Sequence, residues 1–175
     1  MKVMVGIDES DESFYALQWA IDKLFRNEFA IAADVELEPA SLTLLHVRQP
    51  SKHYGGAAAP TGTAFPAGPG VAANYPSIPV VESERNMHQQ ISARILSRAL
   101  EMCGDKVNVE TQILEGDPKD KICEASEKMG IDLLILGSRG LGMIQRAFLG
   151  SVSDYCAHYA KCPVLIVKPP KETTK

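Results

Sequence analysis

The chain has 175 residues, a formal net charge of −4 at pH 7 and a pI of about 5.6. This length is typical of one domain that buries about two thirds of its unfolded surface, and 45% hydrophobic with 23% charged residues is an ordinary globular composition. The acidic balance argues against non-specific nucleic-acid binding, which needs a clustered basic surface, and no apolar run approaches the roughly 20 residues that cross a bilayer. We therefore expect a single cytoplasmic domain over residues 1–175, with no nucleic-acid or membrane partner.

The four cysteines do not form a recognisable metal or redox motif. Their spacing is neither the Cys-x-x-Cys pair of zinc and thiol-redox sites nor the framework of a small disulfide-rich domain. Cys103, Cys123 and Cys156 fall on predicted helices, where thiols serve as small packing residues. We expect reduced thiols and no metal site built from them.

The first part of the chain predicts a strand, a helix and a second strand. Residues 2–8 are mostly apolar and end in Asp8, as expected of a buried strand that leads into a polar turn. Residues 10–13 offer several N-cap oxygens and an acidic first turn, and apolar residues follow at helical spacing as far as Phe25. The second strand covers residues 41–47, which are apolar enough to be covered on both faces.

The segment from Gln49 to about Pro79 differs from the rest of the chain, because Ala, Gly, Pro, Ser and Thr dominate it. Such a segment has too little apolar surface to offset the entropy of ordering it, so we expect a mobile insertion at about 49–79. Two interpretations remain open: a lid or partner-binding loop, or an insertion that the fold tolerates because closure entropy grows slowly with loop length.

After the insertion the pattern predicts a long helix and an edge strand. The helix covers about residues 80–103, with Gly104 as its C-terminal cap. The strand covers residues 107–114, where alternation favours an edge position. The residues expected to share the apolar face of these elements are Met87, Ile91, Ile95, Ala99 and Met102 in the helix and Val107, Val109, Thr111 and Ile113 in the strand.

The last part of the chain predicts two further helix and strand pairs. Asp117 and Pro118 suit the N-cap and the first position of a helix. The next strand covers residues 131–136, which are almost entirely apolar. A helix over residues 151–159 and a final strand over residues 163–167 follow.

Strict alternation of strands and helices predicts an open parallel α/β sheet with helices on both faces and right-handed crossovers. Such sheets bind ligands where the strand order reverses, at the carboxyl ends of two neighbouring strands. Polar motifs follow the first and fourth strands, so a strand order of 3-2-1-4-5 would place both beside one crevice. The position of the motifs, rather than periodicity, favours this order.

The most specific motif is Gly137-Ser-Arg-Gly140, followed after nine residues by Gly150-Ser151-Val152-Ser153. Glycines in the first part let the backbone turn and approach a ligand closely, while a helix that begins after Gly150 directs free N–H groups at phosphate oxygens. The pattern therefore predicts a phosphate site. Further hydroxyl donors to the phosphate are expected from Ser138, Ser151 and Ser153.

The remaining polar residues near these strand ends have open interpretations. Asp8 would repel phosphate, so it suits a ribose hydroxyl or a divalent cation, although Asp is also a preferred helix N-cap. Val47, at the end of the second strand, is expected to meet an adenine edge through its backbone. Arg139 and Arg146 could neutralise phosphate charge, and solvated arginines in an exposed loop fit the sequence equally well.

No set of catalytic residues emerges from the sequence. The chain lacks a Gly-x-Gly-x-x-Gly after the first strand, the Gly-Lys-Ser/Thr of a P-loop and a Gly-x-Ser-x-Gly nucleophile elbow. His46 and His158 have no partner at metal-binding spacing and are typical of core or surface positions. We therefore expect a binding protein rather than an enzyme and assign no catalytic residue.

Together these motifs resemble the universal stress protein superfamily, and its plant-type members in particular. The resemblance rests on Gly137-x2-Gly140-x9-Gly150-Ser151, Val5-Gly-Ile-Asp8-Glu-Ser10 and Val164-Leu-Ile-Val167, and covers the chain apart from the insertion. It implies a Rossmann-like α/β fold with strand order 3-2-1-4-5 and binding of AMP or ATP, often with Mg²⁺ or Mn²⁺. The nucleotide-binding positions that it implies are Ile7, Asp8, Val47, Gly137, Arg139, Gly140, Gly150, Ser151, Val152 and Ser153.

The resemblance also implies a homodimer that forms through the last strand. An apolar edge strand is an aggregation hazard, and antiparallel pairing about a two-fold axis would cover it. The interface residues would be Val164, Leu165, Ile166 and Val167.

Three functions are compatible with the sequence. The first is an adenine-nucleotide-binding stress-response or signalling protein, in which ligand occupancy acts as a switch on a signalling partner of unknown identity. The second is a slow metal-dependent ATPase or phosphotransferase that uses Asp8. The third is a dimerisation scaffold with a vestigial pocket.

Overall fold

The computed structural model describes residues 1–25, 40–49, 78–104, 107–139 and 149–170, so most of the predicted insertion, Gly140 and Arg146 lie outside the described residues. Among the helices described, none is long and apolar enough to cross a membrane. The strands are β1 (Lys2–Gly6), β2 (Ser41–Arg48), β3 (Val109–Glu115), β4 (Leu133–Gly137) and β5 (Val164–Val167). The helices are α1 (Asp11–Ala20), continued by the π-helical turn η1 (Ile21–Phe25), α2 (Ile78–Cys103), α3 (Pro118–Lys128) and α4 (Ser151–Tyr159).

The strands form one parallel sheet in the order β3-β2-β1-β4-β5, which confirms the predicted order. β1 pairs with β2 on one side, where Gly6 is opposite Leu45, and with β4 on the other, where Val5 is opposite Ile135. The first strand therefore lies at the centre, and the chain reverses its direction across the sheet between β1 and β4. This is the position at which an open parallel sheet binds a ligand.

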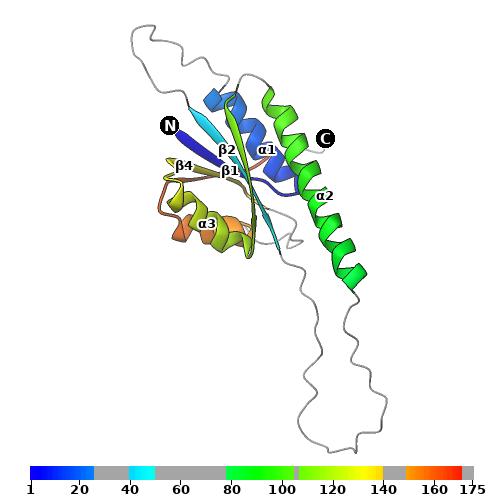
Figure 1. Ribbon diagram of the computed structural model, residues 1–175. Helices are drawn as coiled ribbons and strands as arrows, with labels where there is room; N and C mark the ends of the chain where they lie inside the picture. The colour runs from blue at the N-terminus through cyan, green and yellow to red at the C-terminus, as the bar shows by residue number, and fades with distance from the viewer. Residues whose placement is uncertain (26–39, 50–77, 105–106, 140–148, 171–175) are drawn as a thin grey trace, which may run out of the picture.

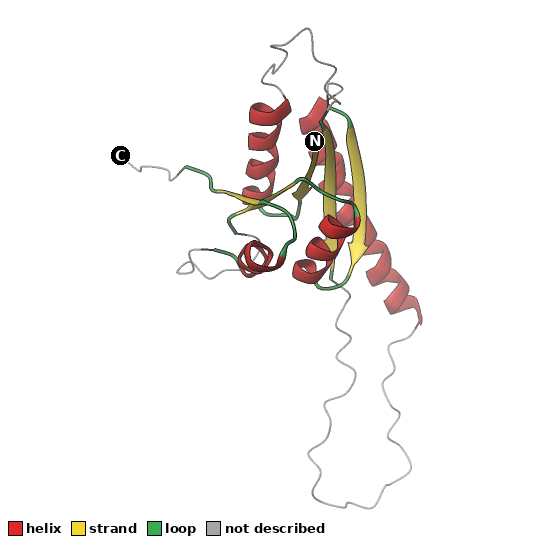
Figure 2. Ribbon diagram, turned by 90° about the vertical axis from the view of Figure 1, so that its left-hand side faces the viewer, coloured by secondary structure: helices red, strands yellow, loops and turns green. Residues whose placement is uncertain are grey.

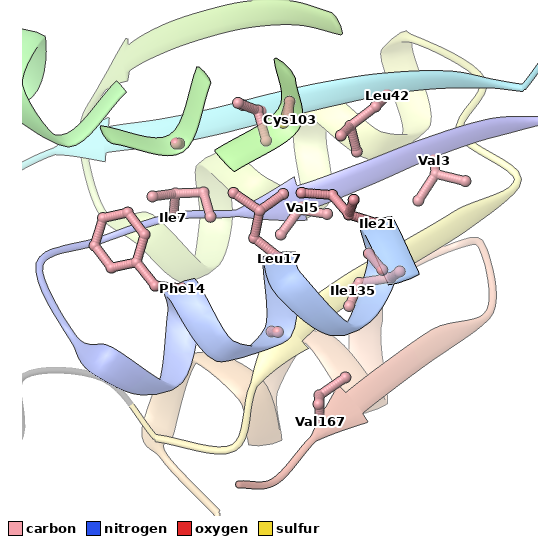
Figure 3. Close-up of a cluster of buried hydrophobic side chains, with 14 of the residues drawn as sticks. Val3, Val5, Ile7, Phe14, Leu17, Ile21, Leu42, Cys103, Ile135 and Val167 are labelled. Atoms are coloured by element: carbon pink, nitrogen blue, oxygen red, sulfur yellow. The ribbon is translucent and has the colours of Figure 1, made fainter. Parts of the chain in front are cut away.

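Helices cover both faces of the sheet, as the alternation predicted (Figure 1). Helices α1 and α2 pack on one face, and α3 and α4 pack on the other. Because neighbouring strand residues point to opposite faces, Val3 and Val5 belong to the core under α1 and α2, whereas Met4 belongs to the core under α3 and α4. Figure 3 shows the first of these cores, in which Leu17 of α1 lies beside Ile7 and Val5.

The helix ends follow from local chemistry that the sequence predicted. Ser10 is the N-cap of α1, and its hydroxyl accepts a hydrogen bond from the Ser13 N–H at 3.3 Å. Asp117 is the N-cap of α3 and accepts from the Lys119 N–H at 3.2 Å, with Pro118 at the first helical position. Gly104 follows α2 with a φ of 60°, a conformation that L-residues rarely adopt.

Two predicted faces were only partly right. Met87 was expected on the apolar face of α2 but is 57% exposed, because the N-terminal part of this helix extends beyond the sheet (Figure 2). In β3 the edge position is confirmed, and Val107 and Val109 pack against the core as expected, but the rest of the predicted face does not. Thr111 and Ile113 are exposed, whereas Gln112 and Leu114 are half-buried, because the edge strand is only partly covered by helices.

Candidate functional site

A crevice of about 1080 Å³ opens at the carboxyl edge of the sheet, where β1 and β4 end. This volume is slightly larger than the roughly 300–1,000 Å³ that ligand pockets usually occupy. The structure brings nine of the ten residues implied by the sequence together in its lining, and the tenth, Gly140, lies outside the described residues. The nine are Ile7, Asp8, Val47, Gly137, Arg139, Gly150, Ser151, Val152 and Ser153.

The β1–α1 turn on one side of the crevice is held together by its own side chains. The Oδ1 atom of Asp8 accepts hydrogen bonds from the Ser10 N–H, at 3.0 Å, and from the Ser10 hydroxyl. The Asp8 N–H in turn donates to the Ser13 hydroxyl at 3.2 Å. Because Ser10 is the N-cap, the interpretation of Asp8 as the helix cap was wrong. Within the described residues its second oxygen, Oδ2, has no hydrogen-bond partner, and Asp8 lines the crevice.

The end of β2 borders the same crevice. The Ile7 N–H donates to the Leu45 carbonyl at 2.9 Å, which is the last backbone bond between β1 and β2. Backbone groups two residues apart in a strand point the same way, so the N–H and C=O of Val47 point towards β1 beyond the end of this pairing. A planar ligand in the crevice would therefore meet a free backbone edge at Val47.

The β4–α4 connection on the opposite side is built differently. The two ends of its undescribed segment are joined by a bond of 2.8 Å from the Gly150 N–H to the Ser138 carbonyl. The Ser153 hydroxyl donates to the Gly137 carbonyl at 2.7 Å, so its proton ties α4 to β4 and is not directed at a ligand. The expectation that this hydroxyl donates to phosphate is therefore wrong for this conformation. The backbone N–H of Ser153 is then the group of this residue that can donate to a ligand.

Gly137 is required by packing against α1. A Cβ atom at this position would lie 2.8 Å from the backbone carbon and oxygen of Glu12 and 3.0 Å from the Ser13 nitrogen. The sequence attributed this glycine to the approach of a ligand. Although Gly137 lines the crevice, the close approach that the structure explains is that of the first turn of α1.

The N-terminus of α4 presents a group of backbone donors at the crevice. Its N-cap is Gly150, with a φ of −73° and a ψ of 153°, and no side chain caps the helix within the described residues. The first intrahelical bond runs from the Asp154 N–H to the Gly150 carbonyl at 2.9 Å. The N–H groups of Ser151, Val152 and Ser153 therefore have no acceptor inside the helix, and all three residues line the crevice.

The charged side chains around the crevice are partly neutralised by each other. Arg48 pairs with Glu115 at 3.3 Å, and Arg94 pairs with Glu9 at 3.3 Å. The Nε atom of Arg48 is the one buried side-chain nitrogen or oxygen among the described residues that lacks a hydrogen-bond partner. No group of three or more His, Cys, Asp or Glu residues in the described part could hold a metal ion.

The cysteines lie outside the crevice lining, and all four are free. Cys103 ends α2, and Cys123 and Cys156 lie in α3 and α4, as predicted. Burial raises the pKa of Cys103 to about 11 and also raises the pKa of Cys156 and Cys123, whose sulfur atoms are 3.7 Å apart. These thiols therefore stay protonated at neutral pH, which fits their expected role in packing.

Sequence reasoning missed the part of the crevice that α2 supplies. His88, Ile91, Ser92 and Ile95 line it, and Pro118 and Ile122 contribute from α3. The apolar spacing of α2 predicted packing on the sheet but gave no sign that this helix passes over the end of β2. His46 was assigned to the core or surface, and although it is buried it also lines the crevice.

The fold and site define a class of protein: an open parallel α/β domain with a ligand crevice at the point where strand order reverses. The model of the universal stress protein family matches residues 1–168. The chain therefore belongs to the universal stress protein family.

Individual relatives agree with this assignment. The universal stress protein PHOS34 of Arabidopsis thaliana is 30% identical over 178 residues, which cover 98% of the chain and 63% of the relative. The chain spans between 52% and 66% of the length of the first three curated relatives. Among solved structures, the universal stress protein UspA from Lactobacillus plantarum has a TM-score of 0.68 at 22% identity and covers 95% of this chain and 97% of its own.

A second solved structure is more similar in sequence. It is a universal stress protein family protein from Arabidopsis thaliana, solved with AMP bound, with a TM-score of 0.55 and 26% identity. The match covers 100% of this chain and 96% of that chain.

Proposed function

We propose that the crevice binds an adenine nucleotide, AMP or ATP. The observation that carries the proposal is the N-terminus of α4, where consecutive backbone N–H groups have no intrahelical acceptor, no side-chain cap is present among the described residues, and the residues line the crevice. Such a helix end is a ready anion site, because its free donors and its dipole both favour negative charge. The AMP-bound relative of 26% identity supports the choice of nucleotide.

Each part of the nucleotide has a matching part of the crevice. The phosphate would accept hydrogen bonds from the N–H groups of Ser151, Val152 and Ser153, while Gly150 lets it approach the backbone closely. The open Oδ2 atom of Asp8 would accept from ribose hydroxyls. The free backbone edge of Val47, beside Ile7, would meet the adenine edge. Arg139 and Gly140 complete the implied set.

A divalent cation would depend on the nucleotide. Asp8 offers one uncommitted carboxylate oxygen, and the described residues contain no cluster that could hold a metal without a ligand. Mg²⁺ prefers a few carboxylate ligands together with substrate phosphates. We therefore propose Mg²⁺ or Mn²⁺ as a companion of bound phosphate, and we assign it no chemical step.

Binding would serve signalling rather than turnover. The chain belongs to a stress protein family. The Ser10 hydroxyl donates to Asp8 but does not line the crevice, and the hydroxyls of Ser13, Ser92 and Ser153, which do line it, donate to backbone carbonyls rather than to a side-chain base. Under this proposal the occupied and empty forms differ in how the mouth of the crevice is presented to a signalling partner.

Ligand analysis of the whole chain tests the nucleotide. Mass spectrometry of small molecules released from purified protein should find AMP or ATP, and calorimetric titration of the emptied protein should give saturable binding of AMP or ATP. Binding of GMP, with the same ribose and phosphate but another base, should be weaker because Val47 faces the base edge. No binding of AMP and ATP at millimolar concentration would overturn the proposal.

We also propose a homodimer through β5, the apolar strand Val164–Val167 at one edge of the sheet. The Leu134 N–H donates to the Pro163 carbonyl and the Ser138 N–H to the Val167 carbonyl, so the odd-numbered residues face β4. By the alternation of a strand, the backbone groups of Val164 and Ile166 point away from the sheet and are available to a second copy.

Light scattering after size exclusion tests this interface. Ile166→Pro removes an outward N–H and should give monomers while leaving the pairing of β5 with β4 intact. Ile113→Pro is the matched control, because it removes an outward N–H from β3 at the opposite edge of the sheet. A dimer that survives Ile166→Pro would contradict the proposed interface.

A further inference from the structure

His46 joins β2 to the end of the central strand β1 in the lining of the crevice. It lies on β2 and is 8% exposed, and its Nδ1 atom is 2.9 Å from the carbonyl oxygen of Ile7, the residue directly before Asp8. A carbonyl can only accept, so Nδ1 must carry a proton and donate. The last backbone bond between β1 and β2 joins the Ile7 N–H to Leu45. The bond from His46 extends this connection by one residue along β2.

The other ring nitrogen of His46 is open. Nε2 has no hydrogen-bond partner within the described residues. Solvent reaches this atom, because the buried side-chain atoms that lack a partner do not include it. By the alternation of β2, His46 points to the same face as Leu42 and Leu44, the face that α1 and α2 cover, and it lines the crevice together with Ser92 and His88 of α2. With Nδ1 protonated, Nε2 of the neutral ring carries a lone pair, so it can only accept a hydrogen bond.

We infer that His46 is a ligand-recognition and positioning residue of the crevice, in which Nδ1–H holds Ile7 and Asp8 in place and Nε2 accepts a hydrogen bond from the bound ligand. The ligand group must be a donor, such as a sugar hydroxyl or an exocyclic amine. A second acceptor, the carboxylate of Asp8, lies one residue beyond the carbonyl that His46 holds. The inference rests on the proposed nucleotide binding and adds a specificity-determining group to it.

Two substitutions separate the two nitrogens. His46→Asn keeps an amide N–H close to the position of Nδ1–H but has no atom at the position of Nε2. His46→Gln reaches the position of Nε2 but loses the donor to Ile7. His158→Asn is the matched control, since the Nδ1 atom of His158 also lies 2.8 Å from a backbone carbonyl, that of Asp154, but the residue is exposed and does not line the crevice.

Calorimetric titration with AMP and urea unfolding of the full chain give the expected results. His46→Asn should unfold at nearly the same urea concentration as the wild type while its Kd for AMP rises about tenfold, as expected for a ligand donor left unpaired. His46→Gln should unfold at a lower urea concentration, and His158→Asn should change neither quantity. Wild-type affinity in His46→Asn would overturn the inference.

The ring nitrogens can also be observed directly in the ¹⁵N-labelled wild type, which needs no variant to fold. Nitrogen spectra of the histidine rings should show a proton on Nδ1 and none on Nε2 of His46, and added AMP should shift the Nε2 signal to lower frequency. A proton on Nε2, or an Nε2 signal unchanged by saturating AMP, would overturn the inference. Absence of any AMP binding by the wild type would instead remove the proposed function, and this inference with it.

Discussion

The two strand-to-helix turns that face each other across the crevice are completed in different ways. In the β1–α1 turn, Ser10 caps the helix and Asp8 accepts from Ser10, so side chains of the turn satisfy its polar groups. In the β4–α4 connection the N-cap of the helix is Gly150, and no side chain within the described residues caps it. The two turns lie at the ends of neighbouring parallel strands, yet among the residues that the structure describes, side chains close the β1–α1 turn and leave the N-terminus of α4 uncapped.

Under the proposed function, this difference assigns the ligand to one turn and a supporting role to the other. A helix N-terminus leaves its first N–H groups without acceptors, and these groups need a side chain, water or a ligand. Ser10 supplies a side chain for α1, and a phosphate would supply the acceptors for α4. The β1–α1 turn is therefore a prearranged wall of the crevice, while the N-terminus of α4 is the part that a ligand would complete.

The largest expected effect is on stability, and it comes from a substitution that pushes β4 away from the first turn of α1. Gly137→Ala would place a Cβ atom 2.8 Å from the Glu12 backbone, which belongs to the first turn of α1 and cannot rotate away. Overpacking of this kind costs about 3 kcal/mol. Urea unfolding should therefore show a loss of about this size in the free energy of unfolding.

Gly130→Ala is the matched control for this prediction. Gly130 has a φ of 61° and open space around it, so alanine there meets only the backbone strain of the left-handed region, about 1 kcal/mol. Equal losses in the two variants would show that Gly137 is not required by packing against α1. If Gly137→Ala has normal stability but binds AMP weakly, Gly137 is needed for the close approach of the ligand, as the sequence suggested.

The second prediction gives α4 a cap like that of α1. Gly150→Thr adds a hydroxyl that can accept from the helix N–H groups, as Ser10 does, and its backbone angles suit an L-residue. Stability should stay within a few tenths of a kcal/mol of the wild type. The Kd for AMP should rise about 30-fold, because charge-assisted bonds to phosphate would be lost. Unchanged affinity by calorimetry would argue against a phosphate at this helix end.

The same comparison shows how much of the molecule the sequence could predict. The strand order was predictable because polar motifs followed the first and fourth strands, and ligand sites in such sheets require those strands to be neighbours. The caps at Ser10 and Asp117 were predictable because they depend only on residues within one turn. The boundaries of α4 were predicted from Gly150 and the residues after it.

Features that depend on distant segments were not predictable. The reason for Gly137 lies in Glu12, which belongs to another helix, and nothing in the sequence near either residue reports their contact. The place of Ile91 and Ile95 in the crevice depends on how α2 crosses the end of β2, after a long insertion in the sequence. An apolar side chain under a helix has the same spacing whether it faces a closed core or a pocket wall.

The third prediction weakens the closed turn. Ser10→Ala removes the cap of α1 and also one of the groups that hold Asp8, so the free energy of unfolding should fall by about 1 kcal/mol. Asp117→Ala is the control, because it removes the cap of α3 at a similar cost without touching the Asp8 network. Chemical denaturation measures both losses. Only Ser10→Ala should also weaken AMP binding. Equal affinities for AMP in the two variants would show that the β1–α1 turn does not contribute to the binding site.

The smallest expected effect concerns the charge of Asp8. Asp8→Asn keeps an Oδ1 acceptor for Ser10 but turns the open oxygen into a donor, so stability should hold while the Kd for AMP rises about threefold. Glu9→Gln is the control, because the Glu9 carboxylate is already paired with Arg94. If Asp8 accepts from ribose, the ratio of the Kd values of Asp8→Asn and the wild type should be the same with and without Mg²⁺. A loss of affinity that occurs only when Mg²⁺ is present would assign Asp8 to the cation. Phosphate release from ATP that requires Mg²⁺ and disappears in Asp8→Asn would favour the ATPase over a binding protein, because the change leaves the α4 donors untouched.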